Sequence, residues 1–118
     1  MAWSLDARIP VTILGSAEAL AAALAQGRPA AVLATGPVAG GVVQGRFAAT
    51  PPHQPGCGCC TGRSPAALEL DRLFQARIRN QCPWFDRVLA LAEDAATVAA
   101  IQQALMADAL TAARYRAA

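Results

Sequence analysis

The stretch IPVTILGS at residues 9–16 decides the fold. Its first six residues form a short apolar run with β-branched side chains, which is typical of a buried strand. Gly15 ends the run, and Ser16 can serve as the N-cap of a helix that continues to about Gln26 and stops at Gly27. This stretch therefore predicts a strand that passes directly into a helix.

The rest of the chain continues this alternation of apolar runs and helical spacing. The predicted segments are strands at residues 30–35, 42–48 and 86–92, and helices at residues 65–80, after an N-cap at Asp94, and at about 108–115. Gly45 weakens the strand at residues 42–48 or marks a bulge. The order predicts an α/β fold, a three-layer Rossmann-like domain with a small, mostly parallel sheet flanked by helices. We expect one domain over residues 1–118.

The composition narrows the classes of function. Hydrophobic residues make up 55% of the chain and charged residues 15%, yet no apolar run approaches the roughly 20 residues that cross a bilayer. With no signal-peptide pattern visible, we expect a cytoplasmic protein without a membrane partner that covers some apolar surface by self-association, as in a dimer. The basic residues are dispersed, which argues against a nucleic-acid partner. All ten are arginine, so a Schiff-base lysine and a P-loop lysine are both excluded.

The sequence GCGCCTG at residues 56–62 is the main functional signal. Cys57, Cys59 and Cys60 can converge on one soft cation, because the neighbouring glycines permit sharp backbone folding. The next helix is predicted to begin with Ser64 as N-cap and Pro65 at its first position. The positive end of that helix, with Arg63 beside it, would favour ionised thiols, so we predict a metal site.

The sequence is compatible with more than one metal ion and with more than one fourth ligand. Zinc or another thiophilic divalent ion is favoured over copper(I). Three thiolates leave a tetrahedral zinc ion one ligand short, and the fourth could be His53, Cys82, water or a group on a partner. Cys82 is better explained as a buried structural thiol. The alternatives are an unmetallated relic loop, or a redox pair formed between Cys57 and Cys59 or Cys60.

Several segments together resemble one known family. They are IPVTIL (residues 9–14), GCGCC (56–60), FDRV (85–88), QAL (103–105) and AARYR (112–116). This set is similar to the CobW-type P-loop GTPases, which include metallochaperones for zinc and cobalt, and GCGCC matches that family's Gly-Cys-x-Cys-Cys loop. The resemblance implies a nucleotide-binding-like domain in which the three cysteines of the loop bind metal.

The chain also departs from that family. Residues 14–18 pass straight into a helix where the family has its phosphate-binding Gly-x-x-x-x-Gly-Lys-Thr loop. Leu91 and Asp94 stand near the expected magnesium-binding acid and γ-phosphate glycine, and residues 36–41 lack the usual acidic switch. The guanine-recognition motif and C-terminal domain are also missing from this sequence. We therefore predict a truncated, degenerate member with no nucleotide cofactor and no catalytic residues, and hence not an enzyme.

Two main functional hypotheses follow from the sequence. The first is a small zinc-binding protein that acts as buffer, sensor or delivery partner through its Cys-x-Cys-Cys loop. The second is an interaction module, which forms a homo-oligomer or binds a full-length CobW-type GTPase while the loop is vestigial. Trp84 and Phe85 are expected in the core or in an interface. Asp94 is expected to cap a helix beside a solvated Glu93.

Overall fold

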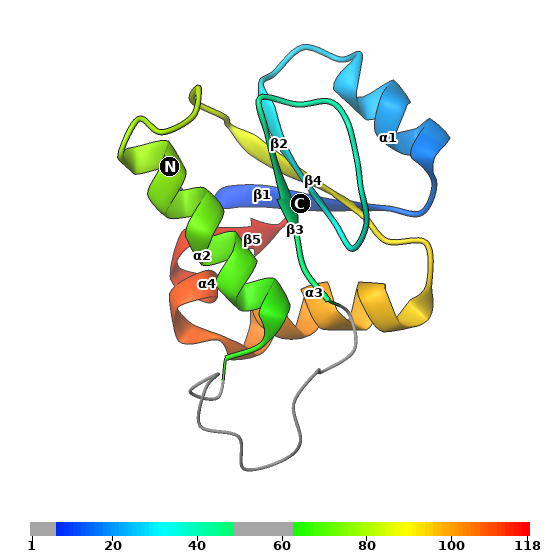
Figure 1. The fold of residues 1–118 in the computed structure, drawn as a ribbon. Coiled ribbons are helices and arrows are strands. Elements are labelled where there is room, and N and C mark those ends of the chain that lie inside the picture. Colours follow the sequence, from blue (N-terminus) through cyan, green and yellow to red (C-terminus); the bar gives the residue numbers. More distant parts are fainter. Residues whose placement is uncertain (1–6, 49–62) are drawn as a thin grey trace, which may run out of the picture.

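The computed structural model describes residues 7–48 and 63–118 (Figure 1). Its centre is a five-stranded sheet in which every pair of neighbouring strands is parallel, with the order β3-β2-β4-β1-β5. The strands are β1 (Ile9–Leu14), β2 (Ala30–Ala34), β3 (Val43–Arg46), β4 (Arg87–Leu91) and β5 (Tyr115–Ala117). The predicted α/β fold with a mostly parallel sheet is confirmed.

In the described residues, four helices cover the two faces of this sheet unequally. They are α1 (Ala17–Leu24), α2 (Pro65–Ile78), α3 (Ala95–Ala107) and α4 (Ala109–Arg114). Figure 1 shows α1 apart from the other three, which gather on the opposite face. The larger core cluster joins the sheet to α2 and α3, whereas a smaller one joins it to α1. The molecule therefore has three layers, with most of its core on the α2 face.

The strand pattern explains why the two core clusters separate. Successive side chains of a strand point to opposite faces of the sheet. In β4, Val88 and Ala90 join the larger cluster, while Leu89 packs in the smaller one against α1. β2 follows the same rule, and all five of its residues are buried. Central parallel strands that are covered on both faces read as continuous apolar runs, and this is how the sequence revealed them.

The predicted N-caps are confirmed. The backbone N–H of Ala19 donates to Ser16 Oγ at 3.1 Å, and Thr97 N–H donates to Asp94 Oδ1 at 2.7 Å. The hydrogen bond from the Thr97 backbone lowers the pKa of Asp94, which is a stabilising anion at the positive end of α3. Glu93 beside it is exposed, as predicted.

The C-terminal segment corrects one prediction. We predicted helix over residues 108–115, but α4 ends at Arg114 and Tyr115 begins β5. β5 pairs in parallel with β1, in the register Ile9 opposite Tyr115. The apolar spacing of residues 108–115 is helical, which is why a helix was predicted. The backbone from Tyr115 onward is instead extended, because it pairs with β1, a strand more than 100 residues earlier. Local pattern carries no information about such a partner.

Parallel strands β2 and β3 are joined without a helix, across the α1 side of the sheet. Residues 35–42 make this crossover, and Gly40 and Gly41 adopt positive φ values of 103° and 72°. A Cβ atom on Gly41 would lie 2.6 Å from the Ala30 carbonyl oxygen. Gly41 therefore meets two demands at once, a left-handed backbone and a close approach to β2.

Candidate functional site

The four predicted metal ligands, Cys57, Cys59, Cys60 and His53, lie outside the described residues. Among residues 7–48 and 63–118, no three His, Cys, Asp or Glu side chains are grouped so that they could hold a metal ion. The zinc site therefore stays a prediction from the sequence. The structure does describe the two anchors of residues 49–62, the segment that contains all four predicted ligands.

The first anchor is the end of β3. The backbone N–H of Phe47 donates to the Ala34 carbonyl of β2 at 3.1 Å, one residue beyond the strand. The Phe47 side chain is 7% exposed and belongs to the larger core cluster. Because both its backbone and its side chain are bound, Phe47 fixes where the chain leaves the carboxyl edge of the sheet.

The second anchor is the start of α2. Ser64 accepts a hydrogen bond from Ala67 N–H at 3.2 Å, and Pro65 occupies the first turn, as predicted. Arg63, one residue earlier, donates from Nε and Nη2 to the two carboxylate oxygens of Asp108, at 3.0 and 2.9 Å. A two-pronged guanidinium–carboxylate pair of this kind fixes orientation as well as position. The segment therefore re-enters the fold at a rigid point.

Further ion pairs extend this anchor toward the C-terminus. Arg63 Nη1 also lies 3.4 Å from Asp71 Oδ2, and Asp71 in turn accepts a hydrogen bond from Arg114. The Arg114 guanidinium stacks over the Phe74 ring at 4.4 Å. Two arginines and two aspartates thus form a charge-balanced network that ties α2 to both ends of α4.

The hydrogen bonds of this network shift the pKa values of two of its members. The hydrogen bonds that Asp108 accepts from Arg63, and then from Thr111, hold its pKa well below the usual range. The same bond from Arg63 to Asp108 raises the pKa of Arg63. We expected Arg63 to add positive charge beside the cysteines, but two carboxylates already engage it. The positive end of the α2 dipole remains as a second source of positive potential at this anchor.

Sequence reasoning missed the partners of Arg63. Asp108 lies 45 residues away, and nothing local links the two positions. Asp108 also caps α4, since it accepts hydrogen bonds from the N–H and the hydroxyl of Thr111 at 3.0 and 2.8 Å. The Asp–x–x–Thr spacing was the available signal for the cap, but it gave no sign of the ion pair.

Cys82 lies just beyond the C-terminal end of α2. It is partly buried and packs against the larger core cluster. The cysteine segment enters α2 at its N-terminus, whereas Cys82 follows its C-terminus, and a helix of 14 residues is about 21 Å long. This placement fits a structural thiol, as the sequence predicted.

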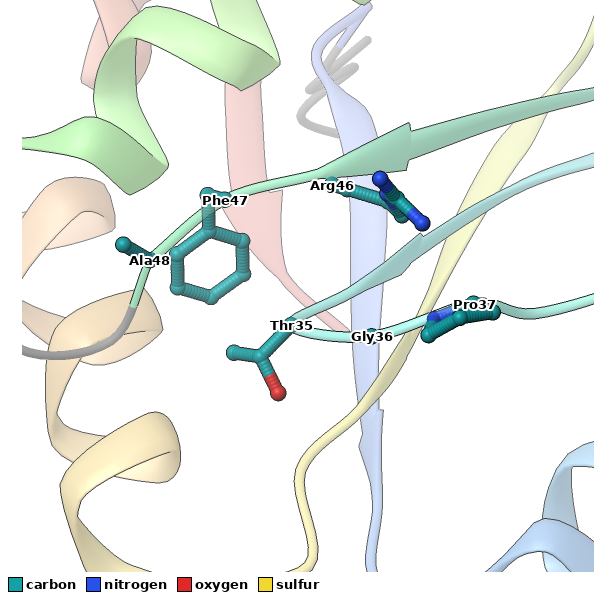
Figure 2. Close-up of a pocket in the computed structure, with 6 residues that line it drawn as sticks. All are labelled: Thr35, Gly36, Pro37, Arg46, Phe47 and Ala48. Carbon is teal, nitrogen blue, oxygen red and sulfur yellow. The ribbon is translucent and has the colours of Figure 1, made fainter.

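A surface hollow of about 440 Å³ lies where the first anchor leaves the sheet. Figure 2 shows it between the ends of β2 and β3, with Thr35, Gly36 and Pro37 on one side and Arg46, Phe47 and Ala48 on the other. A neighbouring hollow of about 150 Å³ shares residues 35–37 and adds Glu93 and Asp94. Ligands of parallel α/β proteins commonly bind at this carboxyl edge.

Four of the described residues that line these hollows have charged or hydroxyl side chains, namely Thr35, Arg46, Glu93 and Asp94. The Arg46 side chain supplies a positive charge to the lining of the larger hollow. Asp94 is already used as the cap of α3. The described lining contains an arginine, a threonine hydroxyl and two carboxylates.

Comparison of the chain with protein-family models, curated proteins and solved structures found no match. The resemblance to CobW-type GTPases thus stays a prediction from the quoted motifs. Within the described ranges, no helix has both the length and the apolar character needed to span a bilayer.

Proposed function

We propose that this protein binds a thiophilic divalent metal ion, zinc before others, through Cys57, Cys59 and Cys60. The fourth position would be filled by His53, by water or by a ligand from a partner. The observation that supports this proposal is that the residues on both sides of the cysteine-bearing sequence are fixed, Phe47 by its hydrogen bond to β2 and Ser64 as the N-cap of α2.

The distance between the anchors leaves ample chain for a site. The backbone N–H of Arg46 lies 3.0 Å from Glu69 Oε2, and Glu69 follows Pro65, the first residue of α2, by four residues, or about 6 Å of helix. Fourteen residues could extend over roughly 46 Å. Fourteen residues are therefore more than the chain needs to join β3 to α2, which leaves length for a binding loop.

The electrostatics of the second anchor also support thiolate chemistry. The positive end of α2 favours anions near its first turn, where the cysteine segment joins it. Fixed anchors further reduce the conformational freedom that metal binding must remove. The proposed role is that of a buffer, sensor or delivery partner for the metal, without nucleotide binding or catalysis and related in origin to CobW-type metallochaperones.

Zinc titration of the reduced protein tests this proposal. We expect one equivalent to bind in competition with a chromogenic chelator. Changing Cys57, Cys59 and Cys60 to serine together should weaken binding by at least about a thousandfold, because each change removes a thiolate ligand. Replacing zinc by cobalt should add thiolate-to-metal absorption that disappears in the same variant.

Cys82→Ser is the matched control, since it removes the remaining thiol and should leave zinc affinity unchanged. His53→Ala should weaken binding about tenfold if the imidazole is the fourth ligand, and not at all if water or a partner fills that position. Wild-type protein that takes up no zinc, or a triple variant that binds as well as the wild type, would refute the proposal.

Partner binding is the second candidate function. Its supporting observation is that several large apolar side chains are exposed, among them Ile78 at 50%, Trp84 at 54% and Met106 at 83%. Trp84 is held in place by the Arg77 guanidinium, 3.5 Å above its ring, while neighbouring Phe85 is fully buried. A homo-oligomer or a complex with a CobW-type GTPase would cover such residues. Light scattering that shows a stable oligomer, dissociated by Trp84→Ala but unaffected by metal, would favour this role.

A further inference from the structure

Among the strands of residues 7–48 and 63–118, β3 lies at one edge of the sheet and pairs with β2 alone. Successive residues of a strand direct their N–H and C=O groups to alternate sides. Because Phe47 N–H donates to β2, the N–H of Arg46 and the C=O of Gln44 point away from it. An edge of this kind is a template on which another strand can pair.

Two side chains from α2 form hydrogen bonds with these outward-pointing backbone groups. Glu69 Oε2 accepts a hydrogen bond from Arg46 N–H at 3.0 Å, and Arg72 Nη2 donates to the Gln44 carbonyl at 3.1 Å. Glu69 and Arg72 also bind each other, at 2.6 and 2.9 Å, from positions three residues apart on α2. One ion pair thus takes up the donor and the acceptor that an incoming strand would use.

Gly45 makes room for this arrangement. A Cβ atom at this position would lie 2.8 Å from Glu69 Oε2, 3.0 Å from Glu69 Cγ and 3.1 Å from Leu73 Cδ1. The φ of Gly45 is not positive, so the backbone conformation does not require glycine here. The missing side chain lets the Glu69 carboxylate reach past the strand to its outer edge.

The opposite edge of the sheet offers little for pairing. β5 is only three residues long, and the N–H of its first residue, Tyr115, donates to the Thr111 carbonyl of α4. Short edge strands are themselves poor templates. β3 is therefore the edge at which pairing has to be prevented by side chains.

We propose that Glu69 and Arg72 guard the β3 edge against pairing with β3 of a second copy of this chain. A two-fold, antiparallel arrangement would bring the Arg46 N–H of each copy toward the Gln44 C=O of the other, because a two-fold interface uses the same surface on both copies. The guard satisfies both groups internally and places a carboxylate and a guanidinium in the path of the incoming strand. Self-association through the sheet edge is thereby blocked.

The double variant Glu69→Ala/Arg72→Ala tests the guard by light scattering over a range of concentrations, with hydrogen exchange on the same samples. We expect its average mass to rise toward twice that of the wild type as concentration increases. The amides of β3 should exchange about tenfold faster than in the wild type when dilute, and become protected when concentrated. The control Glu18→Ala/Arg79→Ala removes one exposed charge of each sign elsewhere and should behave as the wild type.

Gly45→Ala provides a second test that keeps both charged side chains. Its methyl group should displace the Glu69 carboxylate and produce the same association, so it decides the matter if the double variant does not fold. The proposal is overturned if the folded variants keep the mass of the wild type at all concentrations. It is equally overturned if they associate while the amides of β3 gain no protection.

Discussion

Tyr115→Ala is expected to lower the free energy of unfolding by about 3–5 kcal/mol, the largest effect on stability that we predict for a single substitution. Tyr115 is 1% exposed and lies in β5, and its side chain packs between the sheet and α2. Its ring meets Phe74 edge to face, with centroids 6.3 Å apart, and its hydroxyl donates to the Leu70 carbonyl at 2.8 Å. Truncation would leave a cavity where β5, α2 and α4 meet.

Tyr115→Phe separates packing from hydrogen bonding at the same position. It keeps the ring contacts and removes only the buried hydroxyl, so we expect a loss of about 1 kcal/mol. Urea denaturation of both variants gives the two values. A cost for the phenylalanine variant close to that of the alanine variant would contradict the assignment of most of this stability to packing.

Burial also raises the pKa of the Tyr115 phenol, because ionisation would place a negative charge in the core. The native state therefore holds its proton at pH values where an unfolded tyrosine releases it. The resulting contribution is complete below the unfolded pKa near 10 and is lost as the pH rises toward the higher folded pKa.

Asp108→Ala is expected to lower the free energy of unfolding by about 2–3 kcal/mol. The substitution removes the N-cap of α4, worth about 1 kcal/mol, and the two-pronged pair with Arg63. Both side chains of that pair are largely covered, with 20% of Arg63 and 15% of Asp108 exposed. Arg63 would keep only its longer contact with Asp71.

Asp108→Asn distinguishes the two contributions, because asparagine also caps helices well but carries no charge. We expect it to cost about half as much as the alanine variant. Thermal or urea unfolding measures both, and Asp94→Asn at the exposed cap of α3 is a matched control without an arginine partner. Equal losses for the asparagine and alanine variants would mean that the cap contributes nothing.

The pH dependence of the Asp108 contribution follows from its lowered pKa. The ionised form is favoured in the folded state, so its stabilisation is fully present above the unfolded pKa of about 3.9 and declines as the pH falls toward the lower folded value. The difference in stability between wild type and Asp108→Asn should therefore be constant from pH 5 to 7 and shrink in strong acid. A difference that grew on acidification would contradict the ion pair.

Tyr115 and Asp108 also show which interactions could not be predicted from the sequence. The N-caps at Ser16, Ser64 and Asp94 were predictable, because each acts on backbone groups within three residues. The pairing of Arg63 with Asp108 joins residues 45 positions apart, and no local pattern encodes it. For the candidate metal site the sequence alone predicts the ligands, while the structure describes only the residues on either side of them.

The sequence by itself determined the alternation of strands and helices, the parallel α/β class and the starts of three helices. These follow from side-chain periodicity and from hydrogen bonds within one turn, both of which are local. Only the tertiary structure decided the strand order, the β5 strand in place of a longer final helix, and the contacts of Glu69 and Arg72 with the edge of β3. Each of these depends on which distant backbone or charged group lies alongside, and that is settled when the sheet and helices pack together.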